Sequence, residues 1–198
     1  APLESQFATP TAISTVATEI VIKADKETVW NNIKSVSEIQ DKELKWSFAH
    51  FIGIPKPVQS KLKGERVGGV RHIKWEKGIR FREIITDWNL YDSFSYDILV
   101  DHIPPEAIDK HVEVGGKYFD VLNGGYKLTE LDKNTTKLTL SCTYRVTTNF
   151  NFYSKRWADF IMDDFQVVIL NVVKKRSENS YPLTTAKAQT CRLAQQKL

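Results

Sequence analysis

The sequence contains few cysteines and no long apolar run. Only two of its 198 residues are cysteines, Cys142 and Cys191, which excludes a disulfide-dense scaffold and a four-cysteine zinc site. No apolar run reaches the roughly 18 residues that a membrane-spanning helix needs, so we expect the chain as given to be soluble, with no compartment indicated. The first residue is Ala1 and the only methionine is Met162, so we expect that a tag, a signal segment or a larger N-terminal region preceded this sequence.

The sequence also lacks the motifs of the common enzyme classes. It contains no G-x-S-x-G nucleophile motif, no P-loop and no G-x-G-x-x-G fingerprint, so we assign no catalytic residue and no cofactor. None of its four histidines has the spacing of a zinc motif, and a site at His102 and His111 would need loops to converge, so we expect no metal. The 28 basic residues exceed the 24 acidic ones only slightly and are scattered, so the charge alone does not imply nucleic acid and we expect no nucleic-acid partner.

The composition is typical of one globular domain with polar ends. Hydrophobic residues make up 41% of the chain and charged residues 26%. Residues 1–12 are rich in small residues and proline, and we interpret them as a linker or an expression remnant. Residues 13–179 carry the periodic patterns of the domain, and residues 180–198 are interpreted as a polar tail.

The hydrophobic patterns predict a strand, short helices, a run of strands and one long helix. Residues 13–24 alternate, and Asp25 then offers an N-cap for a short helix. A second short helix is expected at 36–41, whereas residues 44–60 have no clear pattern and should be irregular at Pro55–Pro57. Further strands are predicted at 70–75, 79–88, 93–100, 118–131 and 136–147. Residues 152–178 contain neither proline nor glycine and predict a long amphipathic helix.

This order of elements predicts an α+β protein with a helix-grip architecture. A curved antiparallel sheet of about six or seven strands would surround the C-terminal helix, with two short helices after the first strand. The sheet must cover one apolar face, and the long helix is the economical cover. Such a sheet and helix often enclose a cavity, where a small ligand would lie.

A collinear set of short motifs resembles a known superfamily. The motifs are Thr28–Trp30, Trp46–Phe48, Gly53–Pro55, Gly68–Arg71, Gly78, Phe81–Glu83, Ile85–Trp88, Phe94–Ile98, Gly125–Leu128, Thr136–Leu138, Thr143–Tyr144 and the helix around Trp157. Together with the element order, they are similar to the START-like, or SRPBCC, superfamily. A closer likeness is to bacterial polyketide cyclase/dehydrase-like proteins in which this domain follows an N-terminal membrane region.

The resemblance implies a pocket for a hydrophobic ligand, but it does not imply one reaction, because this fold hosts several functions. We therefore expect binding or transport of a hydrophobic small molecule or lipid. The alternative is a polyketide cyclase- or dehydratase-type enzyme that uses acid–base chemistry in the same cavity. The resemblance also implies membrane attachment through a region that precedes Ala1.

The hairpin around residues 76–78 supplies the first candidate site. With a three-residue loop, Arg71 lies opposite Glu83, and alternation places both on a mainly apolar face. That face would also carry Ile73, Trp75 and Phe81. The charged pair is either an anchor for the head group of a ligand or a structural salt bridge at the edge of the sheet. A two-residue turn would change the register and separate the pair.

Aromatic and aliphatic side chains on the facing elements complete the predicted ligand site. Tyr96 and Tyr144 are the better pocket candidates on the strands, because a buried phenol needs a hydrogen-bond partner that a ligand or water can supply. From the long helix, Trp157, Ile161 and Phe165 should face the sheet at helical spacing. The alternative is that these side chains form an ordinary hydrophobic core.

Overall fold

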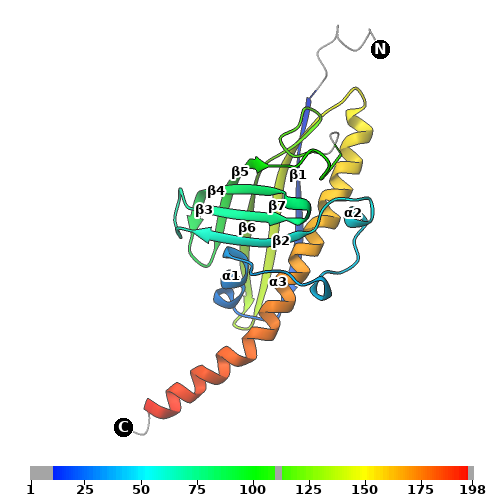
Figure 1. Cartoon of the computed structure of the whole chain (residues 1–198). Helices are drawn as coiled ribbons and strands as arrows, with labels where there is room; N and C mark the ends of the chain where they lie inside the picture. Colours follow the sequence, from blue (N-terminus) through cyan, green and yellow to red (C-terminus); the bar gives the residue numbers. More distant parts are fainter. Residues whose placement is uncertain (1–10, 110–112, 196–198) are drawn as a thin grey trace, which may run out of the picture.

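In the computed structural model of the chain, a seven-stranded antiparallel sheet bends around one long helix (Figure 1). The structure describes residues 11–109 and 113–195, with side chains as far as residue 180. The strand order is β1-β7-β6-β5-β4-β3-β2. The elements are β1 (Thr11–Ile22), α1 (Lys26–Lys34), η1 (Asp41–Glu43), α2 (Phe48–Phe51), β2 (Pro57–Lys63), β3 (Val70–Trp75), η2 (Glu76–Gly78), β4 (Arg80–Asn89), β5 (Ser93–His102), β6 (Phe119–Asp132), β7 (Thr135–Thr147) and α3 (Asn151–Gln195). The predicted fold is confirmed.

Alternation along the strands builds the core. Every second residue of β7, from Thr136 to Val146, is buried, because that face of the sheet is turned toward α3. The buried face of α3 supplies Phe165, Val168 and Val172 to this interior. A long amphipathic helix thus covers one face of an antiparallel sheet, as its apolar stripe predicts.

The free edge of β1 is occupied by α3. Lys174 donates from Nζ to the Val21 carbonyl at 2.5 Å, and Gln166 donates from Nε2 to the Val16 carbonyl at 3.4 Å. Because an unpaired strand edge invites association with other chains, these contacts both hold the helix and protect the edge.

The helix α1 begins where the sequence predicts. Asp25 is its N-cap, and its Oδ1 accepts a hydrogen bond from the Thr28 amide at 2.7 Å. The helix then buries Val29, Trp30 and Ile33. In this way α1 closes the sheet at the end that lies away from α2 (Figure 1).

The segment after α1 differs from the prediction of a helix at residues 36–41. Val36 instead forms a backbone bridge with Ser60, and the Ile39 amide donates to the Val58 carbonyl at 2.8 Å. The short helical elements η1 and α2 lie later in the chain. Pairing with β2 holds this segment extended, and a local helical pattern does not report such pairing.

The strand β2 lies partly inside the region that was expected to be irregular. It begins at Pro57, and a proline is compatible with the first residue of a strand, where its missing N–H does not interrupt the ladder. This strand supplies the seventh member of the sheet.

The helix α3 is longer than predicted. It continues beyond residue 178 to Gln195 and passes through Pro182, and its last turns extend past the sheet in Figure 1. The expected linker (1–12) falls mostly outside the described residues, as do the side chains of the expected tail beyond residue 180, so these domain limits stay predictions. Within the described ranges, no helix is both long enough and apolar enough to cross a membrane.

Candidate ligand-binding cavity

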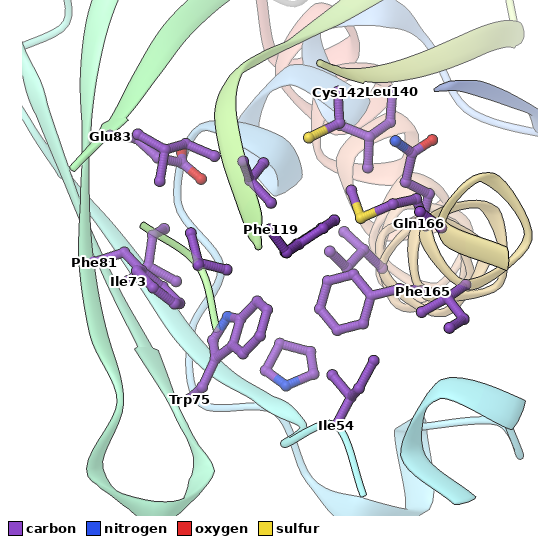
Figure 2. A pocket seen from close by; sticks show the side chains of 18 of the residues that line it. Ile54, Ile73, Trp75, Phe81, Glu83, Phe119, Leu140, Cys142, Phe165 and Gln166 are labelled. Atoms are coloured by element: carbon purple, nitrogen blue, oxygen red, sulfur yellow. The ribbon is translucent and has the colours of Figure 1, made fainter. Parts of the chain in front are cut away.

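A cavity of about 540 Å³ lies between the concave face of the sheet and α3. Figure 2 shows Trp75, Phe81 and Glu83 on one side of this space, with Cys142 and Phe165 on the other. Most of the lining side chains are apolar, and the polar ones are few. A concave, mainly apolar space with a small number of polar groups is typical of small-molecule sites.

The structure brings together all but one of the predicted site residues. Those that line the cavity are Arg71, Ile73, Trp75, Phe81, Glu83, Tyr96, Trp157, Ile161 and Phe165. Tyr144 lies outside the lining, because its hydroxyl donates to Asp159 Oδ1 at 2.7 Å and lies 3.1 Å from the Lys155 carbonyl oxygen. Tyr144 therefore ties β7 to the first turns of α3.

The predicted hairpin register is present. The loop η2 has three residues, and the Trp75 amide donates to the Ile79 carbonyl at 3.0 Å. Lys77 adopts φ 55°, a left-handed conformation that tight hairpin loops require. As a result, Arg71 and Glu83 are direct partners across β3 and β4, with Arg71 Nη1 at 2.8 Å from Glu83 Oε2.

The Arg71–Glu83 pair is buried at one end of the cavity. Side-chain exposure is 4% for Arg71 and 12% for Glu83. Arg71 Nη2 donates to the Ser60 hydroxyl at 3.1 Å, and its guanidinium carbon lies 5.7 Å from the ring centre of Tyr96 and 5.5 Å from that of Tyr126. Among the described residues, the buried Nε–H of Arg71 has no hydrogen-bond partner.

Burial sets the protonation of this polar end. Burial is the largest single effect on Arg71 and opposes its charged form, but the interactions with Glu83, Tyr126 and Tyr96 together outweigh it and raise the pKa of Arg71. Burial also raises the pKa of Glu83, and the attraction of Arg71 offsets only part of that effect. Desolvation raises the pKa of Tyr96 and Tyr126, so both phenols keep their protons and can donate hydrogen bonds.

The opposite end of the cavity reaches the surface beside the start of α3. Tyr153 and Trp157 line the cavity and are also exposed, by 64% and 42% respectively. Trp157 was predicted to face the sheet, but its ring lies at the mouth, with its centre 6.1 Å from that of Phe48 on α2. Ile108 and Val114, which lie between β5 and β6, also line the cavity.

Several lining residues were missed by the sequence reasoning. Tyr126 lies on β6 beside the guanidinium of Arg71, and its alternation with Leu128 on a predicted strand was an available signal. Ser60 lies on β2, which was not predicted, so it had no signal. Gln166 lines the cavity from α3 and accepts a hydrogen bond from Thr18, and an isolated polar residue on an apolar helix face could have indicated it. His111, considered as a metal ligand, lies outside the described residues.

A curved antiparallel sheet that grips a C-terminal helix over an internal cavity defines a helix-grip fold. No protein-family model and no curated protein matches this chain. Solved structures do match it. The chain is similar to the ZhuI aromatase/cyclase from a Streptomyces species, with TM-score 0.54 and 14% identity over 85% of this chain and 96% of that one.

The chain is also similar to a structural-genomics target protein from Mesorhizobium loti. That match has TM-score 0.51 and 14% identity, and it covers 84% of this chain and 98% of the other. At such identities the likeness establishes the fold and carries no residue roles, because this fold supports several functions.

Proposed function

We propose that the protein binds a hydrophobic small molecule or a lipid in the cavity, with a polar group of the ligand placed at the Arg71–Glu83 pair. The observation that carries this proposal is a buried ion pair at the inner end of a mainly apolar cavity that opens to the surface. An apolar body would replace water along the walls, which is favourable in proportion to the apolar area buried.

The polar end supports a ligand with an oxygen acceptor. A buried N–H without a partner costs roughly 1–3 kcal/mol, and a carbonyl, carboxylate or hydroxyl oxygen near Arg71 Nε would relieve that cost. The phenol of Tyr96 lines the same end and supplies a second donor. Glu83 would favour hydroxyl groups over carboxylates, because a hydroxyl can donate to it and a second anion is repelled.

The test measures ligand binding by the wild-type protein and by a variant whose cavity is filled by a larger side chain. Native mass spectrometry of the purified protein should reveal a bound apolar compound, and an apolar fluorescent probe should bind and be displaced by fatty acids or aromatic alcohols. Cys142→Phe places a ring in the cavity and should abolish probe binding, whereas Thr143→Phe, on the other face of the same strand, should preserve it. Equal probe binding by both folded variants would exclude this cavity as the site.

The alternative function is that of a cyclase- or dehydratase-type enzyme acting on a polyketide-like substrate. One observation favours it: the Glu83 carboxyl lines the cavity with a raised pKa, which suits a group that exchanges protons. Glu83→Gln separates the two functions. An enzyme would lose turnover of a poly-β-ketone mimic while it still bound that compound, whereas a binding protein would show no turnover before or after the change.

Membrane attachment by a region before Ala1 remains a prediction from the resemblance. Sequencing of the full gene would test it directly, since an apolar run of about 20 residues would precede this domain.

A further inference from the structure

Exposed aromatic rings form a continuous cluster beside the mouth of the cavity. We define the aromatic patch as Trp46, Phe48, Phe51, Tyr153, Trp157 and Phe160. Neighbouring ring centres lie 5.4–6.5 Å apart, and the Phe48–Trp157 contact joins α2 to α3. Trp46 and Phe51 are 77% and 75% exposed, far more than a ring that completes a core. A contiguous exposed apolar surface of this kind marks an interaction site.

The area of the patch matches what one partner contributes to a stable protein contact. Five of its rings, all except Phe48, are 42–77% exposed, so at about 200 Å² for a whole aromatic side chain they present roughly 600 Å². The exposed ring of Phe152, next to Tyr153 at the start of α3, raises this to roughly 750 Å². A standard interface uses about 800 Å² from each partner.

The charged groups beside the patch are already paired within the chain. Lys56 Nζ lies 3.0 Å from Asp41 Oδ1 and 4.0 Å from Glu76 Oε1. Lys155 Nζ lies 2.6 Å from Asp159 Oδ2. Because these positive and negative charges compensate one another, the patch presents no strong field of one sign, and two identical patches can approach without strong repulsion.

Hydrogen bonds hold the segment that contains α2 against α3. The Ala49 amide donates to Asp164 Oδ2 at 2.8 Å, and Lys45 Nζ donates to Asn171 Oδ1 at 2.9 Å. The rings on the two elements are therefore held in one arrangement before any partner binds. A surface that is already ordered loses less conformational entropy on association.

We infer that the aromatic patch is the contact between two copies of this chain, related by a two-fold axis. Aromatic rings offer both faces and edges, so a cluster of rings can pack against an identical cluster. The guanidinium of Arg156 lies 4.7 Å from the ring centre of Phe152, and arginine is enriched with aromatic residues at protein interfaces. A strongly charged partner finds no complementary field here, whereas a second copy matches the patch in area and in polarity.

Association through the patch has a consequence for the cavity. Tyr153 and Trp157 belong to both the patch and the cavity lining. A contact that buries the patch therefore also covers the mouth, and a ligand should exchange mainly with the separated copies. This consequence rests on the proposed function. The association itself does not, since Trp46 and Phe51 are not part of the lining.

Analytical ultracentrifugation of the full chain tests the association. Between about 0.1 and 100 µM the wild type should change from monomer to dimer, because interfaces of this size reach micromolar affinity or better. Trp46→Ser combined with Phe51→Ser should raise the dissociation constant roughly tenfold or more, because each copy loses two exposed rings. The control Val67→Ser combined with Leu90→Ser removes two side chains that are 59% and 56% exposed elsewhere, and it should leave the dissociation constant unchanged. Circular-dichroism melts establish that each variant is folded.

An apolar fluorescent probe tests the covered mouth. Its dissociation rate from the wild type should fall as the dimer forms, and in the Trp46/Phe51 variant it should not depend on protein concentration. An unchanged rate in the wild-type dimer would refute the covered mouth. Absence of probe binding would refute the proposed function, while the ultracentrifugation still decides the association.

Two results would overturn the inference as a whole. One is a wild-type chain that stays monomeric throughout the concentration range, and the other is equal weakening of the dimer in the patch and control variants. Monomeric protein that sediments with phosphatidylcholine vesicles would assign the patch to lipid instead.

Discussion

Removing one member of the Arg71–Glu83 pair should destabilise the fold much more than removing both. The two groups lie 2.8 Å apart and are nearly inaccessible to water. Two unit charges about 4 Å apart attract by roughly 4 kcal/mol at an effective dielectric constant near 20. Arg71→Met removes that attraction and leaves a buried carboxylate, so we expect a loss of about 3–5 kcal/mol in unfolding free energy at neutral pH.

The double variant Arg71→Met, Glu83→Leu should lose much less, because neither charge then remains alone. Replacement of a buried ion pair by apolar groups of similar volume is often neutral. A cycle of the two single variants and the double variant, measured by urea denaturation, gives the coupling between the side chains. Additive single effects would refute the pairing argument. If the folded double variant kept an unchanged preference for hydroxylated ligands, the pair would have no part in ligand choice.

The difference in stability between Arg71→Met and the double variant should depend on pH in one direction only. In Arg71→Met, burial holds the pKa of Glu83 above its ordinary value of 4.5, and the opposing attraction of Arg71 is gone. A raised pKa in the folded state means that stability is full below 4.5 and falls as pH rises above it, since the unfolded carboxyl releases its proton first. The stability gap between Arg71→Met and the double variant should therefore widen from acidic to neutral pH. A gap that stays constant with pH would show that Glu83 is not the stranded charge.

Three further predictions concern an ion pair between η1 and α3, a close backbone contact beside Tyr96 and the buried thiol of Cys142. The hydrogen bonds from Arg176 lower the pKa of Glu43 from 4.5 to about 2. This pair should therefore add at most about 3 kcal/mol to the free energy of unfolding above pH 4.5, and that contribution should be lost as pH falls toward 2. The melting temperatures of Arg176→Met and the wild type should converge over the same pH range. Gly124→Ala would place a methyl group 2.8 Å from the Tyr96 hydroxyl and 2.9 Å from the Ser141 carbonyl oxygen. The variant should therefore lose about 1–3 kcal/mol of unfolding free energy and bind an apolar probe more weakly in a titration. If the variant is as stable as the wild type, Tyr96 moves freely. Burial raises the pKa of Cys142 to about 12. In a Cys191→Ser background, the Cys142 thiol should therefore react slowly with a maleimide at neutral pH, and more slowly still when an apolar probe occupies the cavity. Rapid labelling would contradict the burial of this thiol.

The parts of the site that could be predicted from sequence are those set by local rules. Arg71 and Glu83 lie five residues on either side of the Glu76–Gly78 loop, so a hairpin of known loop length fixes their opposition. Alternation then places Ile73 and Phe81 on the same face as the pair, and the structure agrees. Asp25 is equally local, since an N-cap needs only the amide three residues later.

The parts that could not be predicted depend on long-range pairing. Ser60 reaches Arg71 because β2 pairs with β3, and neither Pro57 nor the mixed pattern around it signals a strand. The segment at Val36 is extended because it meets the edge of β2, 24 residues later. Tyr144 shows the limit of alternation: it points to the inner side of β7, but Asp159 on α3 binds its hydroxyl, and no strand pattern reports where the helix makes contact.

The two ends of the cavity together define how an amphipathic ligand would enter. Tyr96 and Tyr126 at the polar end pack in the same cluster as Leu170 and Val173, whereas Trp157 lies at the mouth. Val173 lies sixteen positions after Trp157 on α3, which corresponds to roughly 24 Å along the helix axis. A ligand whose polar group binds the Arg71–Glu83 pair must enter with that group first and keep its apolar end toward the mouth.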